Sequence, residues 1–180
     1  MTGPRLAAVV GPSGVGKDSL IAALATADPR LQPIRRVITR PADHTEPFVS
    51  ASDARFDAMV ADDAFLLHWR AHGLRYGVPR AEIVALGPDR TGLVNLSRGV
   101  LAEAADAVRS LVILSVTAPA AVLARRLRGR GREHPEEIET RLARPRPAPP
   151  SNAPMVEIDN SGPLDRAVDA ALAALATEAT

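Results

Sequence analysis

One short stretch near the N-terminus constrains this chain more than any other feature. Residues 11–19 read GPSGVGKDS, follow an apolar run at 5–10 and overlap the start of a helical pattern of apolar residues at 18–27. The spacing matches G-x-x-x-x-G-K in the strand–loop–helix setting that this motif requires. Glycines allow backbone N–H groups to turn inward around phosphate oxygens, and the start of a helix adds partial positive charge. The stretch therefore predicts an α/β fold with a loop that binds the phosphates of a nucleotide.

The only lysine of the chain, Lys17, lies in this loop. Lysine and arginine together number 22, and one of them is Lys17, so the other 21 are arginine. Ammonium and guanidinium groups are not interchangeable, because the ammonium is a compact point charge on a flexible stem. We therefore expect Lys17 to reach the terminal phosphates of the bound nucleotide.

The residue after Lys17 departs from the usual motif, which has Ser or Thr there to bind Mg²⁺. Here that residue is Asp18, and Ser19 follows it. Asp18 could hold the metal directly or through water, because a carboxylate is a hard oxygen ligand. Alternatively, Ser19 binds the metal and Asp18 favours the helix N-terminus. A carboxylate beside a triphosphate repels it unless a cation lies between them, which favours metal binding by Asp18.

The composition excludes several classes of protein. A length of 180 residues suggests one domain. The absence of cysteine excludes disulfides and thiolate zinc sites and suits a reducing compartment. A net charge of +1 gives no electrostatic case for binding nucleic acid, and no apolar run approaches the roughly 18 residues that span a bilayer. We expect a cytoplasmic protein without nucleic-acid or membrane partners; the sequence carries no signal for an oligomeric state.

Strand and helix patterns alternate along the chain. Apolar runs predict strands at 5–10, 34–39, 64–69, 92–96, 111–116 and 155–158. Helical spacing predicts helices at 18–27, 52–61, 79–86, 98–108, 120–130, 134–144 and 164–175. Proline-containing stretches at 40–51 and 145–154 are expected to be loops. Strands separated by helices imply a mostly parallel sheet covered on both faces.

The chain resembles the guanylate-kinase-like branch of small P-loop kinases and, more narrowly, the ribose 1,5-bisphosphate phosphokinases. The segments that carry the resemblance are GPSGVGKDS at 11–19, ITRP at 38–41, WRAHGLRYGVP at 69–79, VNLSR at 94–98, RLRGRGRE at 126–133, IETRLAR at 138–144 and IDNSG at 158–162. In one departure, the loop at 42–49 has Glu46, Pro47 and Phe48 where the narrower family is expected to have Asn and His.

The resemblance implies a single three-layer P-loop kinase domain with three regions. The core would comprise about 1–34, 87–125 and 150–180, a small acceptor-binding insert about 35–86, and a helical lid about 126–145. The implied reaction is ATP-dependent phosphorylation of ribose 1,5-bisphosphate to 5-phosphoribosyl 1-diphosphate, with release of ADP, in phosphonate breakdown. Mg²⁺ is the expected cofactor. ATP and a small phosphorylated sugar are the expected partners.

The resemblance also implies roles for individual residues. Those expected to bind ATP are Gly11, Pro12, Ser13, Gly14, Val15, Gly16, Lys17, Asp18, Ser19 and, beside the adenine, Asn160. Those expected to act on the transferred phosphoryl group are Lys17 and the lid residues Arg130 and Arg141. Those expected to bind the acceptor are Arg40, Tyr76 and Arg98, and those expected to bind the metal are Asp18 and Ser19.

The acceptor region itself favours a sugar phosphate over a nucleotide. A guanine reader needs carboxylates to accept hydrogen bonds from the base, but the segments at 65–69 and 93–98 contain neither Asp nor Glu. Arg40 and Arg98 follow predicted strand ends, where open α/β sheets bind ligands, and guanidinium groups match phosphate oxygens. Tyr76 suits either a phosphate contact or a half-buried core position. A kinase for another phosphorylated acceptor such as GMP, and a non-catalytic P-loop binding module, are the alternative hypotheses.

Overall fold

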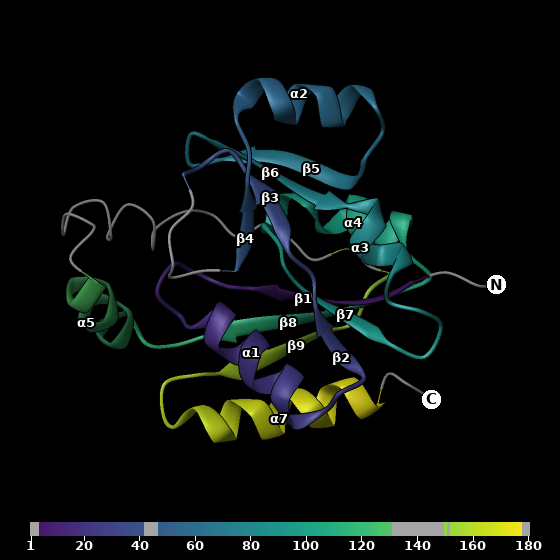
Figure 1. Cartoon of the computed structure of the whole chain (residues 1–180). Helices are drawn as coiled ribbons and strands as arrows, with labels where there is room; N and C mark the ends of the chain where they lie inside the picture. The colour runs from purple at the N-terminus through teal and green to yellow at the C-terminus, as the bar shows by residue number, and fades with distance from the viewer. Residues whose placement is uncertain (1–3, 42–46, 131–149, 151, 178–180) are drawn as a thin grey trace.

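The computed structural model describes residues 4–41, 47–130, 150 and 152–177, and it arranges their strands in two sheets (Figure 1). The five-stranded core sheet has the order β2-β7-β1-β8-β9, and its strand pairs are all parallel. Its strands are β1 (Arg5–Val10), β2 (Leu31–Pro33), β7 (Thr91–Asn95), β8 (Ser110–Thr117) and β9 (Met155–Asp159). This confirms the mostly parallel sheet that the alternation of patterns predicts.

Both faces of the core sheet are covered, as the unbroken apolar character of β1 requires. Leu6, Ala8 and Val10 belong to one buried cluster, whereas Ala7 and Val9 belong to another. Because successive side chains of a strand point to opposite faces, the two clusters lie on opposite sides of the sheet. The fold is therefore a three-layer α/β arrangement.

The helices of the core pack on these two faces. α1 (Lys17–Ala27) and α7 (Leu164–Thr177) pack with the cluster of Ala7 and Val9 and against each other. In Figure 1, α1 crosses in front of the core strands and α7 lies at the bottom of the view. The short η1 (Arg98–Val100) and α4 (Leu101–Ala107) pack on the other face. α5 (Ala120–Arg130) follows β8. Among the described residues, no helix is long and apolar enough to cross a membrane.

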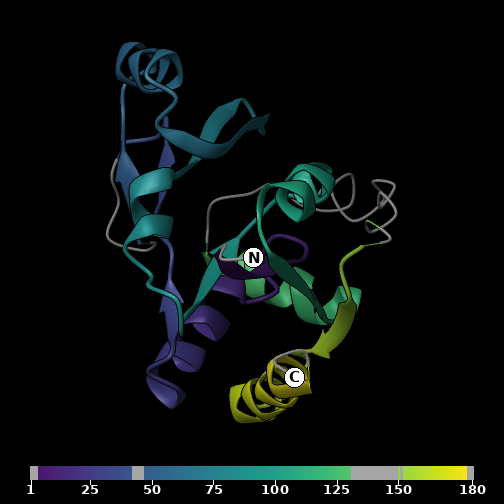
Figure 2. The same cartoon turned by 90° about the vertical axis from the view of Figure 1, so that its right-hand side faces the viewer.

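A second, four-stranded sheet interrupts the core sequence between β2 and β7. It has the order β4-β3-β6-β5 and includes antiparallel pairs, while the five core strands keep the fold mostly parallel, as predicted. Its elements are β3 (Arg36–Ile38), β4 (Phe48–Ser50), α2 (Asp53–Ala61), β5 (Phe65–Ala71), β6 (Leu74–Pro79) and α3 (Arg80–Val84). Figure 2 shows this insert standing to one side of the core sheet. Trp69 and Val78 join it to the core cluster.

Several element predictions were wrong in detail. Leu31–Pro33 forms an edge strand where none was expected, and proline is tolerated at a sheet edge. β4 lies within the expected loop at 40–51, and β6 occupies the stretch before the expected helix at 79–86. His72 and Gly73 both have positive φ, 53° and 74°, as a two-residue hairpin turn requires. The expected helix at 134–144 lies outside the described residues.

Candidate active site

The predicted phosphate loop joins β1 to α1 and is held between two other parts of the chain. Gly14 has φ 78°, and a Cβ atom there would lie 2.8 Å from the Leu127 side chain of α5. Gly16 has φ 94°, and a Cβ atom there would lie 2.7 Å from the Asn160 amide nitrogen. Only glycine combines this conformation with such close neighbours. The loop is therefore enclosed by α5 and by the turn that follows β9.

The ammonium group of Lys17 lies against the start of the same loop. Its Nζ donates hydrogen bonds to the carbonyl oxygens of Gly11 at 3.0 Å and of Pro12 at 3.1 Å. The side chain thus folds back over the loop instead of extending into solvent. Its charge is placed where the sequence predicts an interaction with phosphate.

Asp18 and Ser19, the two candidate metal ligands, have different surroundings. Asp18 is half-buried, and its Oδ1 accepts a hydrogen bond from Nδ2 of Asn95 at 3.1 Å. Ser19 is exposed on α1. Asn95 ends β7, which pairs with β1, so its side chain is positioned by the core sheet. Asn95 was not among the predicted site residues, so its contact with Asp18 was missed.

Asn160 is buried, with 4% of its surface exposed, and its side chain contacts the phosphate loop. Its Nδ2 donates to the Val15 carbonyl oxygen at 2.7 Å. Arg126 of α5 joins the same group, with Nη1 donating to the Val15 carbonyl at 3.3 Å and Nη2 to the Asn160 carbonyl at 2.8 Å. Arg126 was not among the predicted site residues. Only its place in an arginine-rich stretch signalled it.

Arg98 brings a guanidinium group to the same edge of the core sheet. It begins η1, shortly after β7, and its Nη2 donates to Oγ of the buried Ser115 at 3.5 Å. Ser115 pairs in register with Val10, the last residue of β1 before the loop. Lys17, Asp18, Asn95 and Arg98 therefore lie at the edge where β1, β7 and β8 end, which is where open α/β sheets bind ligands.

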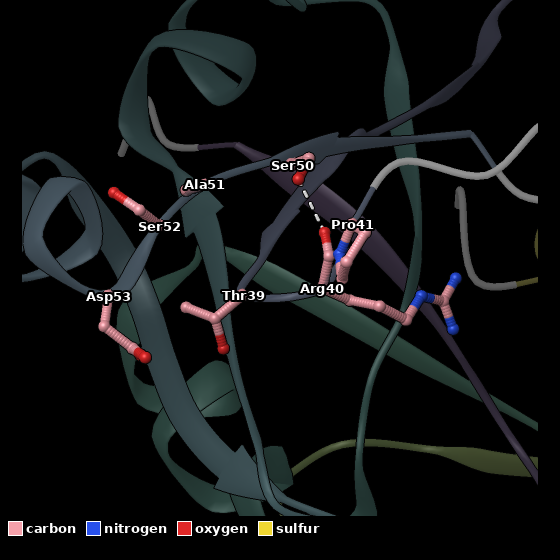
Figure 3. A pocket seen from close by; sticks show the side chains of 7 residues that line it. All are labelled: Thr39, Arg40, Pro41, Ser50, Ala51, Ser52 and Asp53. Atoms are coloured by element: carbon pink, nitrogen blue, oxygen red, sulfur yellow. Dashed lines mark hydrogen bonds between the residues drawn. The ribbon is translucent and has the colours of Figure 1, made fainter.

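Arg40 follows β3 in the insert, beside a cavity of about 400 Å³. The cavity is lined by Thr39, Arg40, Pro41, Ser50, Ala51, Ser52 and Asp53 (Figure 3). The Arg40 guanidinium lies over the Phe48 ring, 4.6 Å from its centroid, and extends away from Ser52 and Asp53. The Ser50 hydroxyl donates to the Arg40 carbonyl and ties β4 to this segment. The Thr39 and Ser52 hydroxyls accept hydrogen bonds from the backbone N–H groups of Arg75 and Arg55, so each retains its own proton to donate to a ligand.

Tyr76 is held within an aromatic stack. Its ring is parallel to that of Trp69, with centroids 5.4 Å apart and an interplanar angle of 9°, and Arg36 lies 5.6 Å from its centroid. It packs, partly buried, against the core cluster. This arrangement fits the half-buried core position, one of the two alternatives for this residue.

Arg75, the residue before Tyr76, is held by contacts within the insert. Its side chain is 13% exposed, pairs with Asp57 at 2.6 Å and lies 4.3 Å from the centroid of Phe56. These contacts tie the β5–β6 hairpin to α2. Of the predicted lid residues, Arg130 ends α5 and Arg141 lies outside the described residues.

Known proteins provide an independent comparison. No family model matches the chain. It is 53% identical over 179 residues to "Ribose 1,5-bisphosphate phosphokinase PhnN" of Ruegeria sp. (strain TM1040), covering 98% of this chain and 93% of that protein.

Solved structures share the fold at low sequence identity. A guanylate kinase from Anaplasma phagocytophilum matches with a TM-score of 0.62 and 15% identity, over 99% of this chain and 87% of that one. A gluconokinase from Sinorhizobium meliloti 1021 matches with a TM-score of 0.59 and 21% identity, over 97% of this chain and 93% of that one. These likenesses confirm the P-loop kinase fold. On the strength of the near full-length curated relative, this chain belongs to the ribose 1,5-bisphosphate phosphokinase family.

Proposed function

We infer that the protein transfers the γ-phosphoryl group of ATP to the 1-phosphate of ribose 1,5-bisphosphate, as a step of phosphonate breakdown. The products are 5-phosphoribosyl 1-diphosphate and ADP. The observation that carries this proposal is the position of Lys17, Asp18, Asn95 and Arg98 at one edge of the core sheet, in a chain of this family.

The phosphate loop supports the donor half of the reaction. Its backbone N–H groups would hold the β-phosphate, and Lys17 would exchange its two carbonyl partners, Gly11 and Pro12, for phosphate oxygens. Phosphate oxygens carry a negative charge that the carbonyl oxygens lack, so Coulomb attraction to ATP would draw the ammonium away from the carbonyls. In phosphoryl transfer, catalysis comes mainly from such positioning and charge neutralisation.

The side chains at the start of α1 fit a magnesium ion. Asp18 accepts one hydrogen bond from Asn95 through Oδ1, and a carboxylate has further lone pairs with which to bind a cation. Carboxylate and hydroxyl oxygens are ligands that suit Mg²⁺. We propose that Asp18 holds the ion, with Ser19 as the alternative ligand, and that Asn95 orients the Asp18 carboxylate. When bound, the ion would neutralise charge on the phosphates.

The insert supports the acceptor half of the reaction. Arg40 in the insert and Arg98 at the adjoining core edge would bind phosphate groups, and the Thr39, Ser50 and Ser52 hydroxyls suit a sugar. The stack on Trp69 favours a core position for Tyr76, so a phosphate contact by its hydroxyl is the remaining proposal for that residue. The acceptor phosphate is already ionised near neutral pH, so no general base is required to create the nucleophile. The bond between the γ-phosphorus and the oxygen that bridges the β- and γ-phosphates breaks. A bond between the γ-phosphorus and an oxygen of the 1-phosphate forms in its place.

Selection against a purine acceptor is supported by β5. The segment at 65–69 lies in β5, where Leu67 is buried in the core cluster and His68 is exposed, and it provides no carboxylate to read a base. The division into core, acceptor-binding insert (about 35–86) and lid (about 126–145) remains a proposal. So does the role of Arg130 and Arg141 in closing over the transferred phosphoryl group.

The direct test is incubation of the protein with ATP, MgCl₂ and ribose 1,5-bisphosphate, followed by detection of phosphoribosyl diphosphate and ADP. We expect both products in equal amounts, and neither when the acceptor is omitted. GMP serves as the competing acceptor. ADP release with GMP but not with the sugar bisphosphate would refute the proposed acceptor. Absence of ADP with every phosphorylated acceptor would refute the proposed reaction.

A further inference from the structure

The Val15 carbonyl of the phosphate loop accepts hydrogen bonds from two distant parts of the chain. Asn160 reaches it from the turn after β9, and Arg126 reaches it from α5. We propose that Asn160 and Arg126 are positioning residues, which hold the Val15–Gly16 peptide in the orientation that binds the β-phosphate. This inference rests on the proposed function for its ligand, a nucleoside di- or triphosphate.

The planarity of the peptide bond gives these contacts their effect. The Val15 carbonyl and the Gly16 N–H belong to one trans peptide unit, so they point in opposite directions. Fixing the carbonyl toward Asn160 and Arg126 therefore directs the Gly16 N–H away from them. The left-handed φ of 94° at Gly16 then leads the chain into α1. The two side chains thereby set the direction of one of the amides expected to bind phosphate.

Gly16 and Asn160 are fitted to each other. The Asn160 amide nitrogen lies 2.7 Å from the place that a Cβ atom of residue 16 would occupy. A side chain at residue 16 would push Asn160 away from the loop and break its bond to Val15. Asn160 is also buried, so water does not readily replace that bond.

Arg126 connects the Val15 and Asn160 carbonyls through a single guanidinium group. Nη1 and Nη2 donate to the two oxygens at 3.3 and 2.8 Å. A guanidinium presents two nitrogen donors in a rigid plane, whereas a lysine ammonium has one nitrogen and cannot reproduce this pair of contacts. Because Arg126 lies on α5, this contact also fixes the helix that leads into the predicted lid.

The resemblance gives Asn160 a different role, as a contact to adenine. The two roles predict different responses to a ligand that has phosphates but no base. If Asn160 orients the loop, its loss weakens the binding of inorganic tripolyphosphate as well as ADP. If Asn160 contacts adenine, its loss weakens ADP binding and leaves tripolyphosphate binding unchanged.

The experiment measures ADP and tripolyphosphate binding by calorimetry for the whole protein and three variants. Asn160→Asp replaces the donor amide with a carboxylate of similar shape, which repels the Val15 carbonyl. Arg126→Lys keeps the charge but not the fork. Arg125→Lys is the matched control, because Arg125 is exposed on the same helix. We expect the first two variants to bind both ligands at least about tenfold more weakly, and the control to stay within about twofold of wild type.

Kinetics separate positioning from a general loss of folded protein. Partial unfolding lowers the active fraction and leaves KM unchanged, whereas the proposed role raises KM for ATP by about tenfold with little change in KM for the acceptor. Arg126→Lys keeps the test decisive if Asn160→Asp does not fold. Unchanged tripolyphosphate binding in a folded variant would overturn the inference. Because tripolyphosphate binding requires no acceptor, this outcome is distinct from a failure of the proposed reaction.

Discussion

Replacement of Lys17 by alanine tests the centre of the proposed mechanism. The ammonium now donates to the Gly11 and Pro12 carbonyls at 3.0 and 3.1 Å. Facing the β- and γ-phosphates about 4 Å away near a protein surface, a unit positive charge gains about 4 kcal/mol from each, which is about 8 kcal/mol in all. Giving up the two carbonyl contacts, each made by a charged donor, offsets about 3 to 6 kcal/mol of this. The remaining roughly 2 to 5 kcal/mol predicts that Lys17→Ala lowers kcat/KM by about thirtyfold to several thousandfold.

The assay is steady-state release of ADP at saturating MgCl₂, with the melting temperature of each protein measured alongside. Arg166→Ala is the control, because Arg166 is an exposed cation on α7 and is not among the proposed site residues. We expect the control to retain wild-type kinetics. A folded Lys17→Ala protein with near-normal kcat/KM would show that the ammonium does not stabilise the transferring phosphates, and the mechanism would have to be abandoned.

Three further predictions follow from the site and its insert. Asp18→Asn should raise the Mg²⁺ concentration for half-maximal rate by about tenfold or more, because a charged ligand is lost; an unchanged Mg²⁺ titration would contradict this. Arg98→Met should raise KM for the acceptor by about tenfold, because a guanidinium that binds the acceptor phosphate is lost, and calorimetry should show unchanged ADP affinity. Weakened ADP binding would show that Arg98 binds the nucleotide instead. Arg75→Met should lower the free energy of unfolding, measured in urea, by about 1 to 2 kcal/mol, because the ion pair with Asp57 and the cation–π contact with Phe56 are lost. Equal stability of the variant and the wild type would show that these two contacts do not stabilise the fold.

The parts of the site that could be predicted from sequence are those formed by neighbouring residues. The phosphate loop depends on the positions of Gly11, Gly16 and Lys17 between a strand and a helix, and all three lie within seven residues. The glycines and the helix start indicate the course of this loop from local sequence alone, whereas the orientation of its Val15–Gly16 peptide depends on Asn160 and Arg126. The burial of β1 on both faces could also be predicted, because its unbroken apolar run is a local pattern typical of a strand covered on both sides.

The missed contacts join residues that are distant in sequence. Asn160 reaches Val15 across 145 positions, and Arg126 reaches it across 111. Such pairs depend on how β9 and α5 pack beside the loop, which residue spacing along one segment does not encode. β4 was missed because three residues are too few to display alternation. β6 was missed because glycine and proline interrupt its pattern.

The departure at Asp18 is explained by its contact with Asn95. A carboxylate beside a triphosphate is unfavourable on its own, and the usual hydroxyl avoids that cost. Asn95 donates to Oδ1 and so fixes the carboxylate at the end of β7. An aspartate in place of Asn95 would remove this donor and set two carboxylates side by side. The amide at the end of β7 therefore allows a carboxylate to replace the hydroxyl after Lys17, and the same amide leaves that strand end without the carboxylate that a guanine reader needs.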